Sequence, residues 1–305
     1  MRQQWAVWAA VLVAVAAAAL AWLAVAVTYR RQRSLQLVDR GGAAAHQAVQ
    51  IGERVMVLET VRERRPYIQI VRDFVSDAEI AALVALGDSK FQESTTLDRS
   101  TGQHTTHPDR TSSTCYLPGE DPIVRAVQAR AAALLHVPAS HSEPLQLTRY
   151  RKDQEYKPHF DYFEPGTEAH RDTDHGYLNS AGEPVPNQRV TTLFVYLTEP
   201  PPEGRACAGG TVFPECGYEV VPTKGAAVLF HNVDEIGRED PTALHGGVVN
   251  RCDDDTYTKI GLNIWFRRMP WTSTPGLSAP KHLQTVQVCA PCDSVHPLVR
   301  CRRKE

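Results

Sequence analysis

The sequence LQLTRYRKDQEYKPHFDYF, residues 145–163, is the stretch around which the predicted fold is organised. Its first six residues alternate as in a β-strand, and a polar turn then leads to His159 and Asp161. Successive side chains of a strand point to opposite faces, so residues two apart share a face and can direct an imidazole and a carboxylate at one point. A second, distant histidine would complete the set of two histidines and one carboxylate that binds Fe(II) and leaves coordination positions open.

The His-x-Asp pattern is weak by itself, because the chain contains it more than once. Two further copies, His107 with Asp109 and His170 with Asp172, lie in polar segments rich in Gly, Pro and Thr, which are typical of loops. We interpret those copies as solvated loop residues. The residues downstream of His159 and Asp161 are what favour these two as ligands.

The overall charge excludes one broad class of function. The chain has 305 residues, and its formal net charge is −2 at pH 7. Proteins that bind nucleic acid neutralise phosphates with a surplus of Lys and Arg. Because this chain has no such surplus, it is not expected to bind nucleic acid.

The N-terminal segment predicts a membrane anchor. Residues 5–27 carry no charge and are rich in Ala, Val and Leu, and as a helix they would span about 35 Å, enough to cross the apolar core of a bilayer. A cleavable signal peptide is the alternative, but the apolar run is long for one. We expect a short flank at residues 1–4, a signal anchor at residues 5–27, and a stem with a weak helical pattern at residues 28–65.

Two features of the sequence point to opposite sides of that membrane. Arg30, Arg31 and Arg33 follow the anchor and, by the positive-inside rule, would place the rest of the chain in the cytosol. The seven cysteines favour a secretory lumen, where disulfides persist. We expect a single-pass type II protein of the endoplasmic reticulum or Golgi membrane, with its main domain in the lumen.

The cysteine spacing suggests particular pairings. Cys207 and Cys216 bracket a Gly-Gly turn and are plausible disulfide partners. Cys289 and Cys292 favour a disulfide over a zinc half-site, because no second pair at zinc spacing follows them. Since the number of cysteines is odd, at least one thiol is free, metal-bound or intermolecular.

Two helices are expected near the start of the main domain. Ser76 and Glu79 form a capping-box pattern at the beginning of an amphipathic segment that ends near Gly87. A second amphipathic segment spans residues 121–137, with Pro122 in its first turn. Two polar segments without periodicity are predicted to form long loops of the kind that cover binding sites, at residues 92–110 and 164–188.

Short apolar segments predict strands through the rest of the domain, at residues 67–75, 145–150, 189–197, 210–214, 218–221, 226–231 and 256–267. Helices followed by many short strands indicate an α+β fold with an antiparallel sandwich or barrel, such as a double-stranded β-helix, the jelly roll. The expected domain covers residues 66–272, and a cysteine-containing tail of residues 273–305 follows it.

Two downstream residues complete a candidate site. His245 is followed by two glycines, which would let backbone approach a crowded metal site. Lys259 lies in a predicted strand in which Ile260, Leu262 and Ile264 alternate, so one face of that strand is expected to be buried. A buried lysine is costly unless its ammonium has a partner, and a dicarboxylate co-substrate would supply one.

Taken in order, these segments resemble the catalytic domain of the prolyl 4-hydroxylase family, as found in its alpha subunits, among the 2-oxoglutarate- and Fe(II)-dependent dioxygenases. The resemblance runs from about Tyr67 to Arg268. It rests on six matching segments: Phe74-Val75-Ser76-Asp77-Ala78-Glu79, Arg110-Thr111-Ser112-Ser113, Tyr150 with His159-x-Asp161, Thr192 with Tyr196-Leu197, Gly209-Gly210-Thr211-x-Phe213-Pro214, and Leu244-His245-Gly246-Gly247.

The resemblance implies roles for particular residues. His159, Asp161 and His245 would bind Fe(II), and Lys259 would pair with the distal carboxylate of 2-oxoglutarate. Tyr150 would donate a hydrogen bond to that carboxylate, Thr192 would line the pocket, and Arg110 would lie near the substrate channel. The family also implies a jelly-roll core, ascorbate as a cofactor, and two loops that close over a peptide, best matched here by residues 93–110 and 164–188.

The activity implied is hydroxylation of peptidyl-proline with O2 and 2-oxoglutarate, giving 4-hydroxyproline, succinate and CO2. The expected partner is a proline-rich or collagen-like peptide. Hydroxylation of another side chain, such as lysine, is the alternative, since substrate choice resides in the loops. A silent module that only binds proline-rich peptide is disfavoured, because all three ligands and the lysine are present. The chain departs from the family pattern at two places, Ile260-Gly261 after the lysine and a longer turn at residues 199–207. We expect these departures to affect substrate preference.

Overall fold

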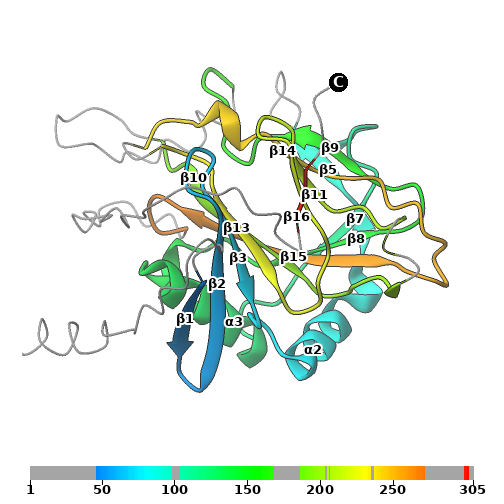
Figure 1. The fold of residues 1–305 in the computed structure, drawn as a ribbon, viewed down its shortest axis with the longest axis horizontal. Helices are drawn as coiled ribbons and strands as arrows, with labels where there is room; N and C mark the ends of the chain where they lie inside the picture. Colours follow the sequence, from blue (N-terminus) through cyan, green and yellow to red (C-terminus); the bar gives the residue numbers. More distant parts are fainter. Residues whose placement is uncertain are drawn as a thin grey trace, which may run out of the picture. The chain divides into compact units, whose positions relative to one another are not determined.

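The computed structural model describes residues 46–97, 104–167, 186–202, 205, 207–234, 237–271 and 299–301. The elements within these ranges are mostly strands, and every strand pair is antiparallel. Figure 1 shows them coloured along the chain.

The larger sheet has nine strands in the order β1-β2-β3-β13-β10-β15-β8-β7-β4. Its members are β1 (His46–Ile51), β2 (Arg54–Arg62), β3 (Ile68–Arg72), β4 (Gln92–Glu93), β7 (Ser113–Tyr116), β8 (Gln146–Tyr150), β10 (Arg189–Tyr196), β13 (Ala227–His231) and β15 (Lys259–Arg267). The strands expected near residues 67–75, 145–150, 189–197, 226–231 and 256–267 are therefore confirmed, with boundaries displaced by a few residues at most ends.

A smaller sheet has five strands in the order β16-β12-β11-β14-β9. Its members are β9 (Tyr156–His159), β11 (Thr211–Phe213), β12 (Tyr218–Val220), β14 (His245–Gly247) and β16 (Val299–Cys301). A separate hairpin pairs β5 (Thr95–Leu97) with β6 (His104–Thr106).

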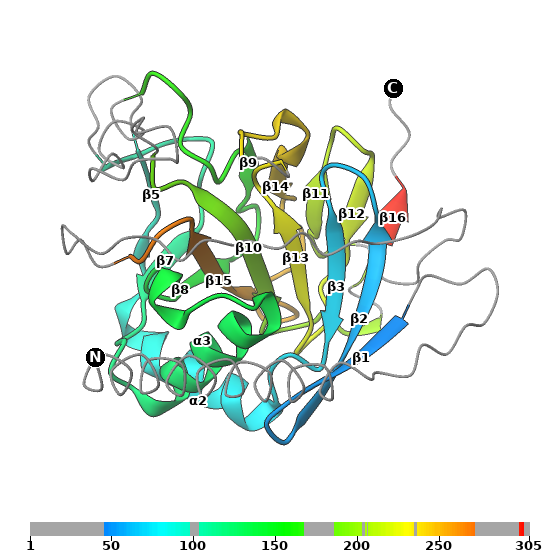
Figure 2. The same cartoon turned by 90° about the vertical axis from the view of Figure 1, so that its left-hand side faces the viewer.

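Two helices, α2 (Asp77–Gly87) and α3 (Pro122–Leu135), lie against one face of the larger sheet (Figures 1 and 2). The predicted capping box is confirmed, because Ser76 caps the backbone N–H of Glu79 and the Glu79 carboxylate accepts from the Ser76 backbone. Asp121 caps α3 through the N–H of Ile123. Apolar side chains of both helices and of the sheet form one core between these layers, with Leu83, Val127, Leu147, Leu193 and Ile264 among its members.

A second core lies between the two sheets. It joins Phe194 and Phe230 of the larger sheet to Phe213 and Val220 of the smaller one. Neighbouring residues of a strand point to opposite faces, so β10 presents Leu193 to the helices and Phe194 to the other sheet. Two antiparallel sheets packed face to face in this way fit the predicted jelly-roll core.

The predicted stem is wrong in its C-terminal part. Residues 46–62 form β1 and β2, which join the larger sheet through pairing of β2 with β3. A two-residue turn at Gly52 and Glu53 connects the strands, and Gly52 has a φ of +60°, which glycine adopts without steric cost. Met56 and Leu58 are buried in the core, so burial on a sheet outweighs the weak helical pattern of this segment.

Other predicted segments also differ from the structure. Residues 92–110, predicted as a loop, include β4, β5 and β6. The tail contains β16, which pairs with β12. Most of the second predicted loop lies outside the described residues, as does the predicted anchor at residues 5–27. Among the helices of the described ranges, none is long and apolar enough to cross a membrane.

The predicted pairing of Cys207 with Cys216 is wrong. Cys207 forms a disulfide with Cys252, which lies 45 residues further along the chain. Cys216 is a free thiol near the turn between β11 and β12. Sequence proximity suggested the nearer partner, whereas the fold brings the loop before β11 against the loop before β15. Cys207 and Cys252 also pack with Tyr257 and Ala208 in a small apolar cluster.

Candidate active site

Strands β9 and β14 bring the three predicted metal ligands together. These strands pair so that His245 lies opposite His159, and Asp161 follows β9 by two residues. The Asp161 Oδ1 atom lies 3.7 Å from His159 Nε2, and its Oδ2 atom lies 3.5 Å from His245 Nε2. The possible ligand atoms of the three residues all lie within 4.8 Å of one another.

Backbone carbonyls set which nitrogen of each imidazole faces the centre. His159 Nδ1 lies 2.8 Å from the Lys157 carbonyl oxygen, and His245 Nδ1 lies 3.0 Å from that of Ala243. A carbonyl only accepts, so each Nδ1 donates and each Nε2 keeps its lone pair for a metal. Burial and the neighbouring His245 lower the pKa of His159 to about 3, which favours the neutral, ligating form.

The Asp161 carboxylate is held by two donors on one of its oxygens. Its Oδ2 atom accepts from Thr192 Oγ1 at 2.7 Å and from Trp265 Nε1 at 2.9 Å. Asn232 Nδ2 in turn donates to Thr192 Oγ1 at 2.9 Å, so this hydroxyl can direct its proton to the carboxylate. Burial alone would raise the pKa of Asp161, but His245, His159 and Arg189 outweigh it and hold the value at about 2.

This donor set fits Fe(II). Two neutral imidazoles and one carboxylate on a single side of a centre leave other coordination positions open. Asp161 Oδ1 faces His159 Nε2, and Asp161 Oδ2 faces His245 Nε2, so the three side chains converge on one centre. Each of the three residues also has a hydrogen-bond partner that orients it, namely a backbone carbonyl for each histidine and the Thr192 hydroxyl for Asp161.

Lys259 provides a cationic end to the same pocket. Its side chain is buried, and its ammonium donates to the Gly210 carbonyl at 2.9 Å. The nitrogen lies 5.0 Å from the Tyr150 ring centre and 5.7 Å from that of Phe194. Burial lowers the pKa of Lys259 to about 7. A carboxylate entering this pocket would restore the charged form and gain an ion pair, which fits one end of 2-oxoglutarate.

The sequence of the chain matches the 2OG-Fe(II) oxygenase superfamily over residues 145–267. Prolyl 4-hydroxylase 1 of Arabidopsis thaliana is 33% identical over 216 residues, which cover 67% of this chain and 69% of that protein. The chain belongs to the prolyl 4-hydroxylase family. Members are 2-oxoglutarate- and Fe(II)-dependent dioxygenases, so His159, Asp161, His245 and Lys259 form the candidate active site of such an enzyme.

Two further proteins are similar to this chain. Probable prolyl 4-hydroxylase 3 of Arabidopsis thaliana is 31% identical over 225 residues, covering 67% of this chain and 72% of that protein. Among solved structures, the viral collagen prolyl hydroxylase of Paramecium bursaria Chlorella virus 1 in complex with 2-oxoglutarate is similar. Its TM-score is 0.47 at 24% identity, with 67% of this chain and 98% of that chain covered.

The two glycines after His245 leave room for groups that pack closely against β14 in this prolyl 4-hydroxylase family member. A Cβ atom at Gly246 would lie 2.9 Å from the Tyr156 carbonyl oxygen on the paired strand. A Cβ atom at Gly247 would lie 3.3 Å from the Tyr150 hydroxyl oxygen. The expectation that backbone closely approaches these glycines is therefore confirmed for Gly246, whereas the close neighbour of Gly247 is the Tyr150 side chain.

Tyr150 and Arg110 both line the pocket. Tyr150 is opposite Lys259 in the β8–β15 pair, and burial raises its pKa to about 12, so its hydroxyl remains a donor. Arg110 donates to the Thr95 carbonyl at 3.0 Å and to Gln146 Oε1 at 3.2 Å, and its guanidinium lies 4.7 Å from the Tyr156 ring centre. These contacts keep a cation at the pocket entrance.

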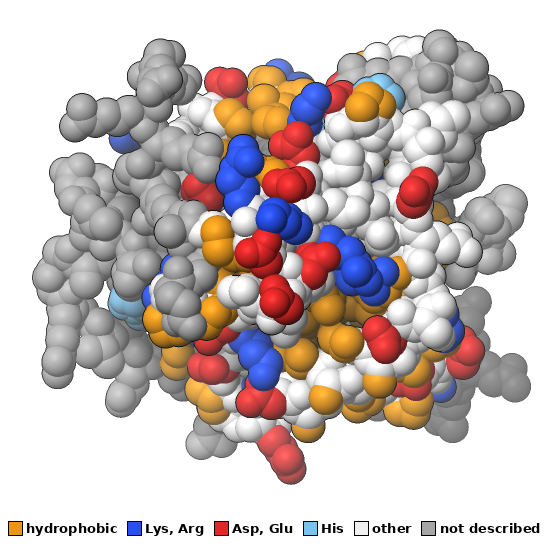
Figure 3. Space-filling model, turned by 90° about the vertical axis from the view of Figure 1, so that its right-hand side faces the viewer, with side chains coloured by type: hydrophobic (Ala, Val, Ile, Leu, Met, Phe, Trp, Pro, Cys, Tyr) orange, Lys and Arg blue, Asp and Glu red, His pale blue; other side chains and the backbone are white. Residues whose placement is uncertain are grey.

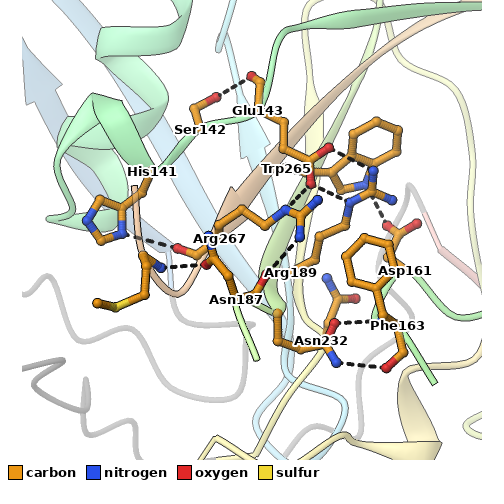
Figure 4. Close-up of polar contacts among 12 residues, drawn as sticks. His141, Ser142, Glu143, Asp161, Phe163, Asn187, Arg189, Asn232, Trp265 and Arg267 are labelled. Carbon is orange, nitrogen blue, oxygen red and sulfur yellow. Dashed lines mark hydrogen bonds and ion pairs between the residues drawn. The ribbon is translucent and has the colours of Figure 1, made fainter. Parts of the chain in front are cut away.

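One buried network was missed by the sequence analysis. Glu143 accepts two hydrogen bonds from Arg189, at 2.6 and 2.7 Å, and pairs also with Arg267 (Figure 4). The Arg189 guanidinium lies 3.9 Å from the Trp265 ring, whose N–H holds Asp161. The available signal was an arginine at the end of each of two apolar strands, which requires an acidic partner when buried.

Proposed function

We propose that this protein hydroxylates peptidyl-proline, using O2 and 2-oxoglutarate and giving 4-hydroxyproline, succinate and CO2. The observation that carries the proposal is one pocket that holds the His159, Asp161 and His245 cluster together with buried Lys259. Relatives named prolyl 4-hydroxylases cover about two thirds of the chain, which supports proline as the residue that is modified.

One group of side chains is assigned to the metal and another to the co-substrate. His159, Asp161 and His245 hold Fe(II), which when bound with 2-oxoglutarate activates O2 for insertion into a C–H bond. Lys259 and the Tyr150 hydroxyl bind the distal carboxylate of 2-oxoglutarate. Thr192 and Trp265 keep Asp161 oriented and ionised. Ascorbate is a cofactor typical of this family.

The peptide is expected to enter beside Arg110. This residue lines the pocket and donates a hydrogen bond to the Thr95 carbonyl in β5. The β5–β6 hairpin is therefore connected to the pocket. On the face of the molecule drawn in Figure 3, acidic and basic side chains lie interspersed.

Mass spectrometry of peptide products tests the reaction. The purified protein, supplied with Fe(II), 2-oxoglutarate and ascorbate, receives matched peptides that contain either proline or lysine at the central position. One added oxygen on proline is expected from the parent protein, and none from the His159→Ala variant. His107→Ala is the matched control, because His107 belongs to a second His-x-Asp pattern, is exposed, and lies outside the cluster.

The alternatives give different results in the same assay. Oxygen on lysine with none on proline would move the assignment to a side-chain hydroxylase of another specificity. Absence of any turnover of 2-oxoglutarate, with retained binding of proline-rich peptide, would identify a silent binding module and contradict the proposal.

We further propose a lumenal location with an N-terminal membrane anchor. The uncharged apolar run at residues 5–27 supports the anchor. The disulfide between Cys207 and Cys252 supports an oxidising compartment such as the endoplasmic reticulum or Golgi lumen. Protease treatment of sealed microsomes is the test: protection of the folded domain that disappears with detergent is expected, and digestion without detergent would contradict the location.

A further inference from the structure

A buried carboxylate lies behind the lysine of the co-substrate pocket. The Lys259 ammonium donates to the Gly210 carbonyl at 2.9 Å, and the Gly210 N–H donates to Glu219 Oε1 at 3.1 Å. Gly210 therefore connects the two side chains, with its carbonyl bound to Lys259 and its N–H bound to Glu219. Glu219 is 3% exposed, so the site lies within the protein.

The backbone is shaped to admit the Glu219 side chain. A Cβ atom at Gly210 would lie 2.7 Å from Glu219 Cγ and 2.8 Å from Glu219 Oε1. Any other residue at position 210 would displace the carboxylate from this place. The neighbouring β11–β12 pairing is fixed by Tyr196, whose hydroxyl donates to Thr211 Oγ1 at 2.7 Å and lies 3.2 Å from the Val220 carbonyl.

The surroundings of Lys259 leave Glu219 as a charge that acts on the Lys259 ammonium. On β8 and β10 the lysine faces the rings of Tyr150, Phe194 and Tyr196, and on the β11 side it faces a carbonyl. Among the described residues, Glu219 is the charged group found to act on the Lys259 pKa, and it raises that pKa against the larger lowering effect of burial. On the other side of β12, strand β16 places Arg300 opposite Glu219 in register.

We propose that Glu219 is a positioning residue for 2-oxoglutarate. Its hydrogen bond with the Gly210 N–H holds the backbone of Gly210 in place, the Gly210 carbonyl in turn holds the Lys259 ammonium in the pocket, and the charge of Glu219 favours the charged form of that ammonium. The inference rests on binding of 2-oxoglutarate at Lys259 and not on which peptide is modified. It predicts that the hydrogen bond and the charge of Glu219 contribute separately to the affinity for 2-oxoglutarate.

Two substitutions separate these contributions. Glu219→Ala removes both, whereas Glu219→Gln keeps an oxygen that accepts from Gly210 and removes only the charge. Calorimetric titration of 2-oxoglutarate into protein loaded with Mn(II), which avoids turnover, gives the dissociation constant directly. We expect Glu219→Ala to weaken binding about tenfold, the loss typical of one hydrogen bond near a charge.

The pH dependence distinguishes positioning from mere structural support. Without the nearby negative charge the lysine loses its proton at lower pH, so binding by Glu219→Gln should match the parent within about twofold at pH 6 and be several-fold weaker at pH 7.5. Glu215→Gln, a change of an exposed carboxylate between β11 and β12, is the matched control and should follow the parent throughout.

Turnover gives a second readout. For both Glu219 variants the KM for 2-oxoglutarate should rise in the same proportion as the dissociation constant, while kcat at saturating 2-oxoglutarate stays within about twofold. The proposal is overturned if Glu219→Ala, folded by its thermal unfolding curve, binds 2-oxoglutarate as the parent does. It is also overturned if the Glu219→Gln and parent affinities remain parallel across this pH range. A peptide that is never hydroxylated would count against the proposed function alone, since binding is measured without it.

Discussion

The hydrogen bond from Trp265 to Asp161 offers a quantitative test of the metal site. Trp265→Phe removes the Nε1–H donor that lies 2.9 Å from Asp161 Oδ2 but keeps an aromatic ring next to Arg189. A hydrogen bond to a charged group contributes about 1.5–3 kcal/mol, and about 1.4 kcal/mol corresponds to a tenfold change in an equilibrium constant. We therefore expect the variant to bind Fe(II) about 10- to 100-fold more weakly, as is usual when a residue that hydrogen-bonds to a metal ligand is removed.

Anaerobic titration with Fe(II), followed by the amount of metal bound per chain, measures this affinity. Trp271→Phe is the matched control, since Trp271 is 41% exposed and its ring contacts Arg267 and not Asp161. That control should bind Fe(II) as the parent does. Thr192→Val removes the second donor to the same oxygen and should weaken binding to a similar degree.

A Trp265→Phe variant that binds Fe(II) within twofold of the parent would refute the reasoning. It would mean that Thr192 and the protein matrix orient Asp161 without the indole. A loss of affinity accompanied by an equal loss in Trp271→Phe would also refute it, because the effect would then come from general loosening of this region.

Three further outcomes are expected. Glu143→Gln should cost about 3–5 kcal/mol in the free energy of unfolding, because it leaves Arg189 and Arg267 buried without their carboxylate. Burial would raise the pKa of Glu143, but the two arginines lower it overall. The parent should therefore lose stability as the pH falls below about 4.5, and the variant should lose less. Denaturant titrations from pH 3 to 7 measure the free energy of unfolding of both proteins. Cys207→Ser should lower the free energy of unfolding by about 2–4 kcal/mol under oxidising conditions. Under reducing conditions, the variant and the parent should have the same free energy of unfolding. Gly246→Ala should weaken Fe(II) binding, since its methyl group would press on the strand that carries His159, and unchanged binding would contradict the fit of β14 against β9.

Local patterns in the sequence were sufficient for much of the fold and site. The spacing of His159 and Asp161 and the capping box at Ser76 involve residues a few positions apart, so backbone geometry alone constrains them. His245 and Lys259 were identified by the glycines behind the former and by the apolar alternation around the latter. Their approach to the same pocket then required the resemblance to a known family.

The features that were missed depend on contacts between distant segments. Glu143 is 46 residues from Arg189 along the chain, and a register shift between Arg189 and Thr191 changes which side chains of β10 face the site. Trp265 reaches Asp161 across 104 residues. No local spacing specifies such pairs, because sheet order and register decide them.

Two predictions failed for related reasons. The segment at residues 46–62 was assigned to a stem because residues 28–65 show a weak helical pattern, yet pairing of β2 with β3 makes it part of the sheet. Cys207 was assigned to its nearer neighbour Cys216, whereas the fold brings Cys252 to it. In both cases a long-range partner outweighed the local pattern.

The central claim is that the pocket formed by His159, Asp161, His245 and Lys259 couples oxidation of 2-oxoglutarate to hydroxylation of proline. The most direct test counts succinate and 4-hydroxyproline formed in one reaction with a proline-rich peptide. We predict equal amounts of the two products from the parent protein and neither product from Asp161→Ala. Succinate that forms without 4-hydroxyproline on any proline-rich peptide, or 4-hydroxyproline that persists in Asp161→Ala, would contradict the claim.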